Sequence, residues 1–130
     1  MTEAPIICLA SASPRRRELL AQLGVPHVVA PADIDESRRE HESPGDYVLR
    51  MALEKARRVA DARARSRGLP VLGADTSVVV QDRVLGKPAD AAESRAMLEL
   101  LSGRTHEVLS GVALVDGRGA QTRLSRTEVP

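Results

Sequence analysis

Three consecutive arginines stand where a helix should disfavour them. In the stretch LASASPRRRELLAQLG, residues 9–24, Ser13 is a good N-cap residue and Pro14 suits the first helical position. The arginines at 15–17 then fill the first turn, where the helix dipole is already positive and each cation costs about 0.3–1 kcal/mol. A phosphate-rich anion bound there would turn this cost into a binding gain, because N–H groups, dipole and guanidinium groups would all face it. The alternative is that the arginines extend into solvent and pair with acidic neighbours.

Lys55 is the second residue whose position suggests chemistry. It shares one face of an expected helix with Val48, Ala52 and Val59, at helical spacing. Lysines avoid full burial unless they are paired. Lys55 either reaches a phosphate or carboxylate in a cleft, or it lays its stem on the core and keeps its ammonium group in water.

Asp75 is a carboxylate between two strongly apolar segments, PVLG and SVVV. We expect it on a loop that leaves the end of a sheet strand, which is where α/β proteins usually bind ligands. An ionised group there needs a metal or cation partner. The alternative is that the Asp75 side chain only caps a tight connection.

An acidic loop, PADIDESRREHE, follows the second expected strand and carries Asp33, Asp35 and Glu36. Taken alone, these acids describe an ordinary solvated loop. One or two carboxylates together with substrate phosphates are, however, the usual ligands of Mg²⁺. With the arginines, Lys55, Asp75 and Lys87 in LGKP, the pattern favours a metal and polyphosphate site.

Composition excludes several other classes. A net charge of +1 gives no global basic field for nucleic acid or membrane, and an aromatic content of 1% leaves few stacking platforms for a nucleic-acid polymer. The single cysteine, Cys8, lies in the apolar run IICLA and is expected to be a buried, inert thiol. No signal peptide or membrane span is visible, so the expected location is the cytoplasm. Neither a P-loop nor a G-x-G-x-x-G fingerprint is present.

The elements that must position these residues alternate between strands and helices, which predicts one α/β domain over residues 1–130. We expect a mixed, twisted sheet with helices packed on it and a nucleotide cleft at the strand ends. In the first half of the chain we expect strands at 6–9 and 27–30, a helix at 14–23, and a helix at 44–67 that begins after Ser43. Strands in LPVLG and SVVV follow, and then a turn at 82–83 and a helix at 91–101. The chain ends in a hairpin over 105–129 that bends near Asp116 and Gly117.

These residues also carry a family resemblance. The segments LASASPRR, DIDE, YVLRMALEKA, VLGADTSV, LGKP and MLELLSGRTHEV resemble, in order and spacing, the Maf family of nucleoside triphosphate pyrophosphatases. The resemblance covers nearly the whole chain. It implies hydrolysis between the α and β phosphates of a nucleoside triphosphate, giving a monophosphate and pyrophosphate, in a house-cleaning role in nucleotide metabolism.

The resemblance also implies roles for individual residues and a divalent metal, Mg²⁺ with Mn²⁺ as an alternative. Asp75 matches the catalytic acid–base position, Glu36 lies near the metal or water, and Asp75 and Glu36 would be the metal ligands. Lys55 is grouped with these catalytic residues. The positions that match the family's phosphate contacts are Ser11, Arg15, Arg16, Lys55 and Lys87.

Thr76 points to a branch of the family. The sequence GADT is similar to the branch that acts on dTTP, UTP and modified pyrimidine nucleotides, and by analogy Arg15 and Thr76 would take part in base selection. The branch that acts on 7-methyl-GTP typically has a Gln at the corresponding place.

Members of this family usually continue for several tens of residues beyond the point where this chain stops, including a segment resembling KAGAYGIQG. The chain is therefore expected to be C-terminally shortened, with an unprotected sheet edge that favours a homodimer. Two alternatives to turnover remain open at this point. One is a nucleotide-binding or cell-division regulatory protein, and the other is an inactive truncated product.

Overall fold

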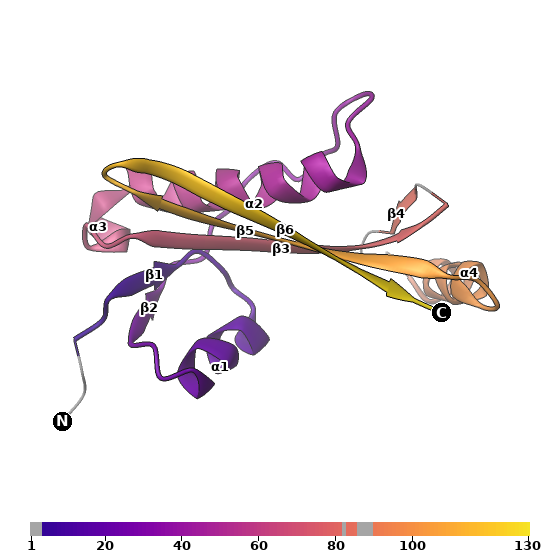
Figure 1. Cartoon of the computed structure of the whole chain (residues 1–130), viewed down its shortest axis with the longest axis horizontal. Coiled ribbons are helices and arrows are strands. Elements are labelled where there is room, and N and C mark those ends of the chain that lie inside the picture. Colours follow the sequence, from indigo (N-terminus) through magenta and orange to yellow (C-terminus); the bar gives the residue numbers. More distant parts are fainter. Residues whose placement is uncertain (1–3, 82, 86–89) are drawn as a thin grey trace.

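The computed structural model describes residues 4–81, 83–85 and 90–130 of the chain. Within these residues, six strands form one sheet and four helices pack around it (Figure 1). The elements in chain order are β1 (Ile7–Leu9), α1 (Pro14–Gln22), β2 (His27–Val29), α2 (Pro44–Asp61), α3 (Arg63–Ser66), β3 (Val71–Val80), β4 (Arg83–Leu85), α4 (Ala91–Leu101), β5 (His106–Asp116) and β6 (Gly119–Val129).

The sheet is mixed. Its strand order is β2-β1-β3-β5-β6, and β4 also pairs with β3. β1 runs parallel to both β2 and β3. β5 runs antiparallel to both β3 and β6, and β4 runs antiparallel to β3. Helices lie between the parallel strands in the chain, whereas β5 and β6 form a hairpin, and β4 and α4 lie between the antiparallel strands β3 and β5. This architecture confirms the predicted α/β class.

Among the described residues, helix α2 supplies more of the buried hydrophobic residues than any other element, five of fourteen. Its buried apolar residues recur at helical spacing and face the sheet, where they pack against Cys8, Val71 and Ala113. In Figure 1, α2 lies along one face of the sheet and α1 on the opposite side. Burial raises the pKa of the Cys8 thiol, which confirms the expected buried cysteine. The buried residues of α2 are Gly45, Val48, Met51, Ala52, Ala56 and Val59.

The helix starts follow the predicted caps. The Ser13 hydroxyl accepts a hydrogen bond from the Arg16 amide at 3.4 Å, and the Ser43 hydroxyl accepts one from the Asp46 amide at 3.1 Å. Both helices have proline at the first helical position. Gly24 follows the end of α1 with φ of +73°, as the sequence predicts for a helix stop.

The prediction of one helix over 44–67 was wrong. α2 ends at Asp61, because Ala62 leaves helical geometry with φ −91° and ψ 74°, and the four-residue α3 follows. Local propensity favours a continuous helix here, but tertiary contacts override it. Ser66 is buried, and the Arg65 guanidinium donates a hydrogen bond to the Pro31 carbonyl, so the chain turns back toward the sheet.

The placement of Asp75 on a loop between two strands was also wrong. β3 is one continuous strand, and Asp75 lies in its middle, paired with Gly111 of β5. Nine consecutive residues of β3, from Val71 to Val79, pair with β5 and so satisfy the backbone through the polar stretch. Asp75 and Thr76 interrupt the hydrophobic pattern of β3 because their side chains line a cavity, not because the strand ends there.

The C-terminal hairpin and the helix at 91–101 are confirmed with the expected bounds. The hairpin bends between Asp116 and Gly119, where the Asp116 carboxylate accepts from the Arg118 amide at 2.8 Å. Among the described residues, β6 pairs with β5 on one side and with no strand on the other, and the homodimer stays a prediction. None of the helices described is long and apolar enough to cross a membrane. The expected turn at 82–83 falls partly outside the described residues.

Candidate active site

The site lies at a gap in the sheet beside β3. β5 covers one edge of β3 from Val71 to Val79. On the other edge, β1 pairs as far as Leu72, and β4 begins to pair only at Val78. Within the described residues, the segment 73–77 thus has no strand partner on that edge, and Asp75 and Thr76 occupy the gap. The predicted cleft at the strand ends is therefore at the end of β1, alongside the middle of β3.

Lys55 lies between two carboxylates in this gap. Its ammonium nitrogen is 3.2 Å from Asp75 Oδ1 and 3.5 Å from Glu36 Oε1. The side chains of Lys55 and Asp75 are each 14% exposed, while that of Glu36 is 61% exposed. Lys55 is therefore the paired lysine in a cleft rather than one that extends into water, and the bond to Asp75 joins α2 to β3.

The surroundings of Asp75 shift the pKa of its carboxyl group. Burial raises the pKa of this carboxyl above its ordinary value, and the Glu36 charge raises it further, while Lys55 and Arg16 oppose the shift. A carboxyl group with a raised pKa binds a proton more readily than an ordinary aspartate does. Such shifts concentrate at functional sites, and Asp75 is accordingly the strongest candidate for proton transfer.

The start of α1 forms the opposite side of the gap. Arg16 Nη2 donates to the Thr76 hydroxyl at 3.4 Å, and the Thr76 hydroxyl is also 3.5 Å from that of Ser110. Ser11 is buried, and its hydroxyl accepts from the Ser13 amide at 3.0 Å. Arg15 is exposed and does not line the cavity, so of these two arginines the structure brings Arg16 to the gap.

These groups enclose a cavity of about 470 Å³ that carries both signs of charge. Asp33 and Asp35 do not line it; Asp35 instead accepts from the Ser37 hydroxyl at 2.6 Å and its amide at 2.9 Å. Of the three acidic side chains Asp33, Asp35 and Glu36, only that of Glu36 lines the cavity. Lys87 lies outside the described residues. The lining residues are Ser11, Ala12, Ser13, Pro14, Arg16, Ala32, Glu36, Lys55, Asp75 and Thr76.

Two carboxylates converge on the cavity, although no described group of three or more His, Cys, Asp and Glu side chains is arranged to hold a metal ion. Mg²⁺ is commonly held by one or two carboxylates, with the remaining positions filled by water and substrate phosphates. Asp75 and Glu36 suit that pattern. Residues 31–42 thus contribute one ligand candidate, Glu36.

Comparison with known protein families shows the family of this chain. A family model described as "Maf-like protein" matches residues 6–130. This chain belongs to the Maf family. The chain is 52% identical over 122 residues to a dTTP/UTP pyrophosphatase of Hahella chejuensis. The aligned region spans 92% of this chain and 61% of that protein. It is 57% identical over 111 residues to a dTTP/UTP pyrophosphatase of Symbiobacterium thermophilum. This aligned region spans 85% of this chain and 56% of that protein.

The Maf chain thus spans about three fifths of the length of these curated relatives. Two solved structures share its fold at low identity. One is a nucleoside-triphosphatase, dITP/XTP pyrophosphatase, from Mycobacterium abscessus, with a TM-score of 0.52 at 21% identity over 94% of this chain and 70% of that one. The other is the Staphylococcus aureus Ham1 protein, with a TM-score of 0.58 at 15% identity over 95% and 69%.

Sequence reasoning gave no role to Tyr47 and Arg50, which bind the loop that carries Glu36. The Tyr47 hydroxyl donates to the Glu36 carbonyl at 2.6 Å, and Arg50 Nη2 donates to the Ser37 carbonyl at 2.8 Å. Two features of the sequence mark Tyr47, although neither marks Arg50. Tyr47 is the only aromatic residue, and it lies eight positions before Lys55, on the same helical face.

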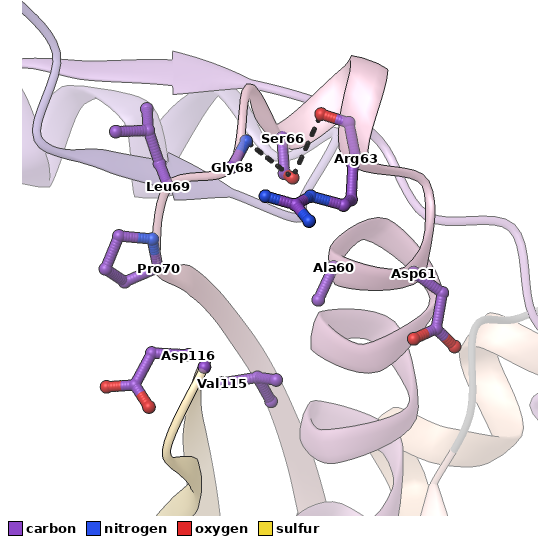
Figure 2. Close-up of a pocket in the computed structure, with 10 residues that line it drawn as sticks. Ala60, Asp61, Arg63, Ser66, Gly68, Leu69, Pro70, Val115 and Asp116 are labelled. Atoms are coloured by element: carbon purple, nitrogen blue, oxygen red, sulfur yellow. Dashed lines mark hydrogen bonds between the residues drawn. The ribbon is translucent and has the colours of Figure 1, made fainter.

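A second cavity, of about 480 Å³, lies at the other end of β3 (Figure 2). Its buried polar side chain, Ser66, already donates to the Arg63 carbonyl at 3.4 Å and accepts from the Gly68 amide at 3.3 Å. The charged side chains there, Asp61, Arg63 and Asp116, are exposed. This cavity therefore lacks the buried, paired charges that distinguish the first one.

Proposed function

We propose that this chain carries the phosphate- and carboxylate-bearing part of a nucleoside triphosphate pyrophosphatase site. The reaction would be hydrolysis of a nucleoside triphosphate at the α–β bridge, giving a monophosphate and pyrophosphate. The observation that carries the proposal is the placement of Lys55 between Asp75 and Glu36, beside Arg16. More than half of the residues match those of dTTP/UTP pyrophosphatases over the aligned region, which supports the same chemistry.

The cations and helix start suit a triphosphate. Arg16 and Lys55 approach the cavity from different elements, and α1 directs its positive end toward it, with Ser11 buried in the preceding loop. A triphosphate bound between them would have its charge neutralised on two sides. The same groups would stabilise the negative charge that develops on the phosphates during bond cleavage. Under this proposal, phosphate binding accounts for Arg16 in the first turn of α1, whereas Arg15 and Arg17 are exposed and do not line the cavity.

Asp75 is the proposed base. In the proposed step, a water oxygen attacks a phosphorus atom of the α–β bridge while the water proton passes to the Asp75 carboxylate. The bridging P–O bond breaks, and the departing phosphate group takes its electron pair. Lys55 keeps Asp75 oriented toward the cavity, and the exposed Glu36 carboxylate orients the water from the opposite side.

Asp75 and Glu36 are also the residues that would hold a divalent metal, Mg²⁺ or Mn²⁺. When bound, such an ion supplies additional neutralisation of phosphate charge and polarises the scissile bridge. This assignment rests on the position of the two carboxylates, which both contact the Lys55 ammonium group. A divalent cation bound together with the substrate phosphates could contact the same two carboxylates.

Thr76 supports the pyrimidine branch of the family, with dTTP, UTP and modified pyrimidine nucleotides as substrates. Its hydroxyl faces Arg16 and Ser110 at the edge of the cavity. The proposed base-selecting role of Arg15 would require this exposed side chain to reach the nucleotide from outside the cavity. Lys87 remains proposed as a phosphate contact. We further propose a cytoplasmic location and a homodimer that pairs along β6.

The test is product analysis on a panel of nucleoside triphosphates with Mg²⁺, comparing the chain with Lys55→Met and with Asp61→Asn as a distant, exposed control. We expect pyrophosphate and monophosphate from dTTP and UTP, loss of turnover in Lys55→Met, and normal turnover in Asp61→Asn. Release of orthophosphate and a nucleoside diphosphate would show cleavage of the β–γ bridge instead of the α–β bridge. Nucleotide binding without any product would establish a binding protein instead, and absence of both would establish an inactive chain.

A further inference from the structure

The loop that carries Glu36 is attached to α2 by two consecutive backbone contacts. The Tyr47 hydroxyl donates to the Glu36 carbonyl at 2.6 Å, and Arg50 Nη2 donates to the next carbonyl, that of Ser37, at 2.8 Å. Both donors lie on the first three turns of α2. The Glu36 side chain itself is 61% exposed, and its ion pair with Lys55 spans 3.5 Å. The backbone attachment therefore fixes the position of Glu36 more firmly than its own side-chain contact does.

Arg50 is itself held by Glu42, at the far end of the same loop. Arg50 Nε lies 2.6 Å from Glu42 Oε2, and Arg50 Nη2 lies 2.8 Å from Glu42 Oε1, which is a bidentate pair. The two side chains are 14% and 9% exposed. The Arg50 guanidinium also lies 5.6 Å from the centre of the Tyr47 ring. Arg50 thus binds the loop at two points, the Ser37 carbonyl near its start and the Glu42 carboxylate at its end.

The same helix also carries Lys55. Tyr47 and Lys55 are eight residues apart and lie on one face of α2, so the loop and the ammonium group are positioned by one rigid element. A movement of the 36–42 segment away from Tyr47 would separate Glu36 from Lys55 without any change in Asp75. Neither Tyr47 nor Arg50 lines the cavity, so both act at one remove from a bound nucleotide.

We propose that Tyr47 and Arg50 are positioning residues that hold the Glu36 carboxylate against the Lys55–Asp75 pair. The inference rests on the proposed function, in which Glu36 orients the attacking water. Because the hydroxyl and the guanidinium bind the backbone of the loop, they act on Glu36 whatever the rotamer of its side chain.

A double-mutant cycle in kcat tests this inference. Tyr47→Phe removes only the hydroxyl, and we expect kcat for dTTP to fall about 2- to 12-fold, the equivalent of one hydrogen bond, with little change in KM. In a Glu36→Gln background the same change should have little further effect, because the residue it positions is already disabled. Arg50→Lys should behave like Tyr47→Phe. Arg58→Gln, an exposed arginine on the same helix, is the matched control and should leave kcat unchanged.

Equal losses from Tyr47→Phe in both backgrounds would overturn the inference, since Tyr47 would then act independently of Glu36. A second readout keeps the test informative if the chain shows no turnover, which would refute the proposed function alone. Amide hydrogen exchange over residues 36–42 should become faster in Tyr47→Phe and Arg50→Lys but not in Arg58→Gln. Unchanged exchange would show that these side chains do not hold the loop.

Discussion

Gly73→Ala is the substitution that most directly tests the packing of α2 on β3. A Cβ at Gly73 would overlap the Ala52 carbonyl oxygen and would lie 3.0 Å from both the Cβ and the amide nitrogen of Ala56. These are atoms of the helix itself, which cannot rotate away as the end of a long side chain can. To restore an ordinary contact of at least 3.4 Å between this Cβ and the carbonyl oxygen, α2 must move away from β3 by roughly 1 Å.

The magnitude follows from that displacement. Overpacking of a core costs about 1–3 kcal/mol, and contact with backbone places Gly73→Ala near the upper limit. The move would also lengthen the 3.2 Å contact between Lys55 and Asp75 to about 4 Å, beyond hydrogen-bond reach. We therefore expect a loss of about 3 kcal/mol in the free energy of unfolding, together with a loss of activity.

Urea denaturation provides the assay, and two other glycines provide a graded comparison. A Cβ at Gly111 would lie 2.8 Å from a Val48 methyl group and 3.1 Å from the Val48 carbonyl oxygen. Because its backbone contact is longer than that at Gly73, Gly111→Ala should cost less. Gly117 has nothing within 4 Å, so Gly117→Ala should be neutral. Away from such contacts, Gly to Ala within a strand stabilises by about 0.5–1 kcal/mol. A Gly73→Ala protein as stable as wild type, or more stable, would refute the close packing.

Three further predictions concern charged groups. Arg16→Ala should weaken binding of a non-hydrolysable dTTP analogue about 10-fold, the worth of a charged contact, while Arg15→Ala should have a smaller effect; isothermal titration calorimetry measures both. The hydrogen bond from Arg50 lowers the pKa of Glu42 from its ordinary value of 4.5 to about 2. The ion pair therefore stabilises the fold fully above pH 4.5, and this stabilisation is lost as the pH falls from 4.5 toward 2. Glu42→Gln should thus cost about 2 kcal/mol at pH 7, with the difference from wild type shrinking in urea melts between pH 5 and pH 3. Burial raises the pKa of Asp75, so ionisation of this group opposes folding as pH rises through that pKa, and Asp75→Asn should be at least as stable as wild type at pH 7.

Much of the fold could be predicted because the signals are local. Ser43 followed by Pro44 marked the start of α2, and the hairpin bend at Asp116 and Gly117 followed from turn chemistry. The break at Ala62 could not be predicted, because its cause is the burial of Ser66 and the contact of Arg65 with a distant carbonyl. Local propensity contains no information on such contacts.

The candidate site shows the same division. Lys55 and Asp75 could be identified because each is a charged residue in an apolar pattern, and the structure pairs them at 3.2 Å. The strand geometry around Asp75 was missed because the pairing partner, β5, lies over thirty residues further along the chain. The roles of Tyr47 and Arg50 were missed because both side chains bind backbone carbonyls, and residue type and spacing do not show which carbonyl a side chain binds.

The measurement that tests the central proposal most directly is pyrophosphate release from dTTP with Mg²⁺ by the chain and by its Asp75→Asn variant, with nucleotide affinity measured in parallel. We predict release by the chain, loss of release in the variant by about 100-fold or more, as expected for removal of a general base, and nucleotide binding retained in both. Release that is unchanged in Asp75→Asn would contradict the account, because the base would then lie elsewhere than in the gap beside β3.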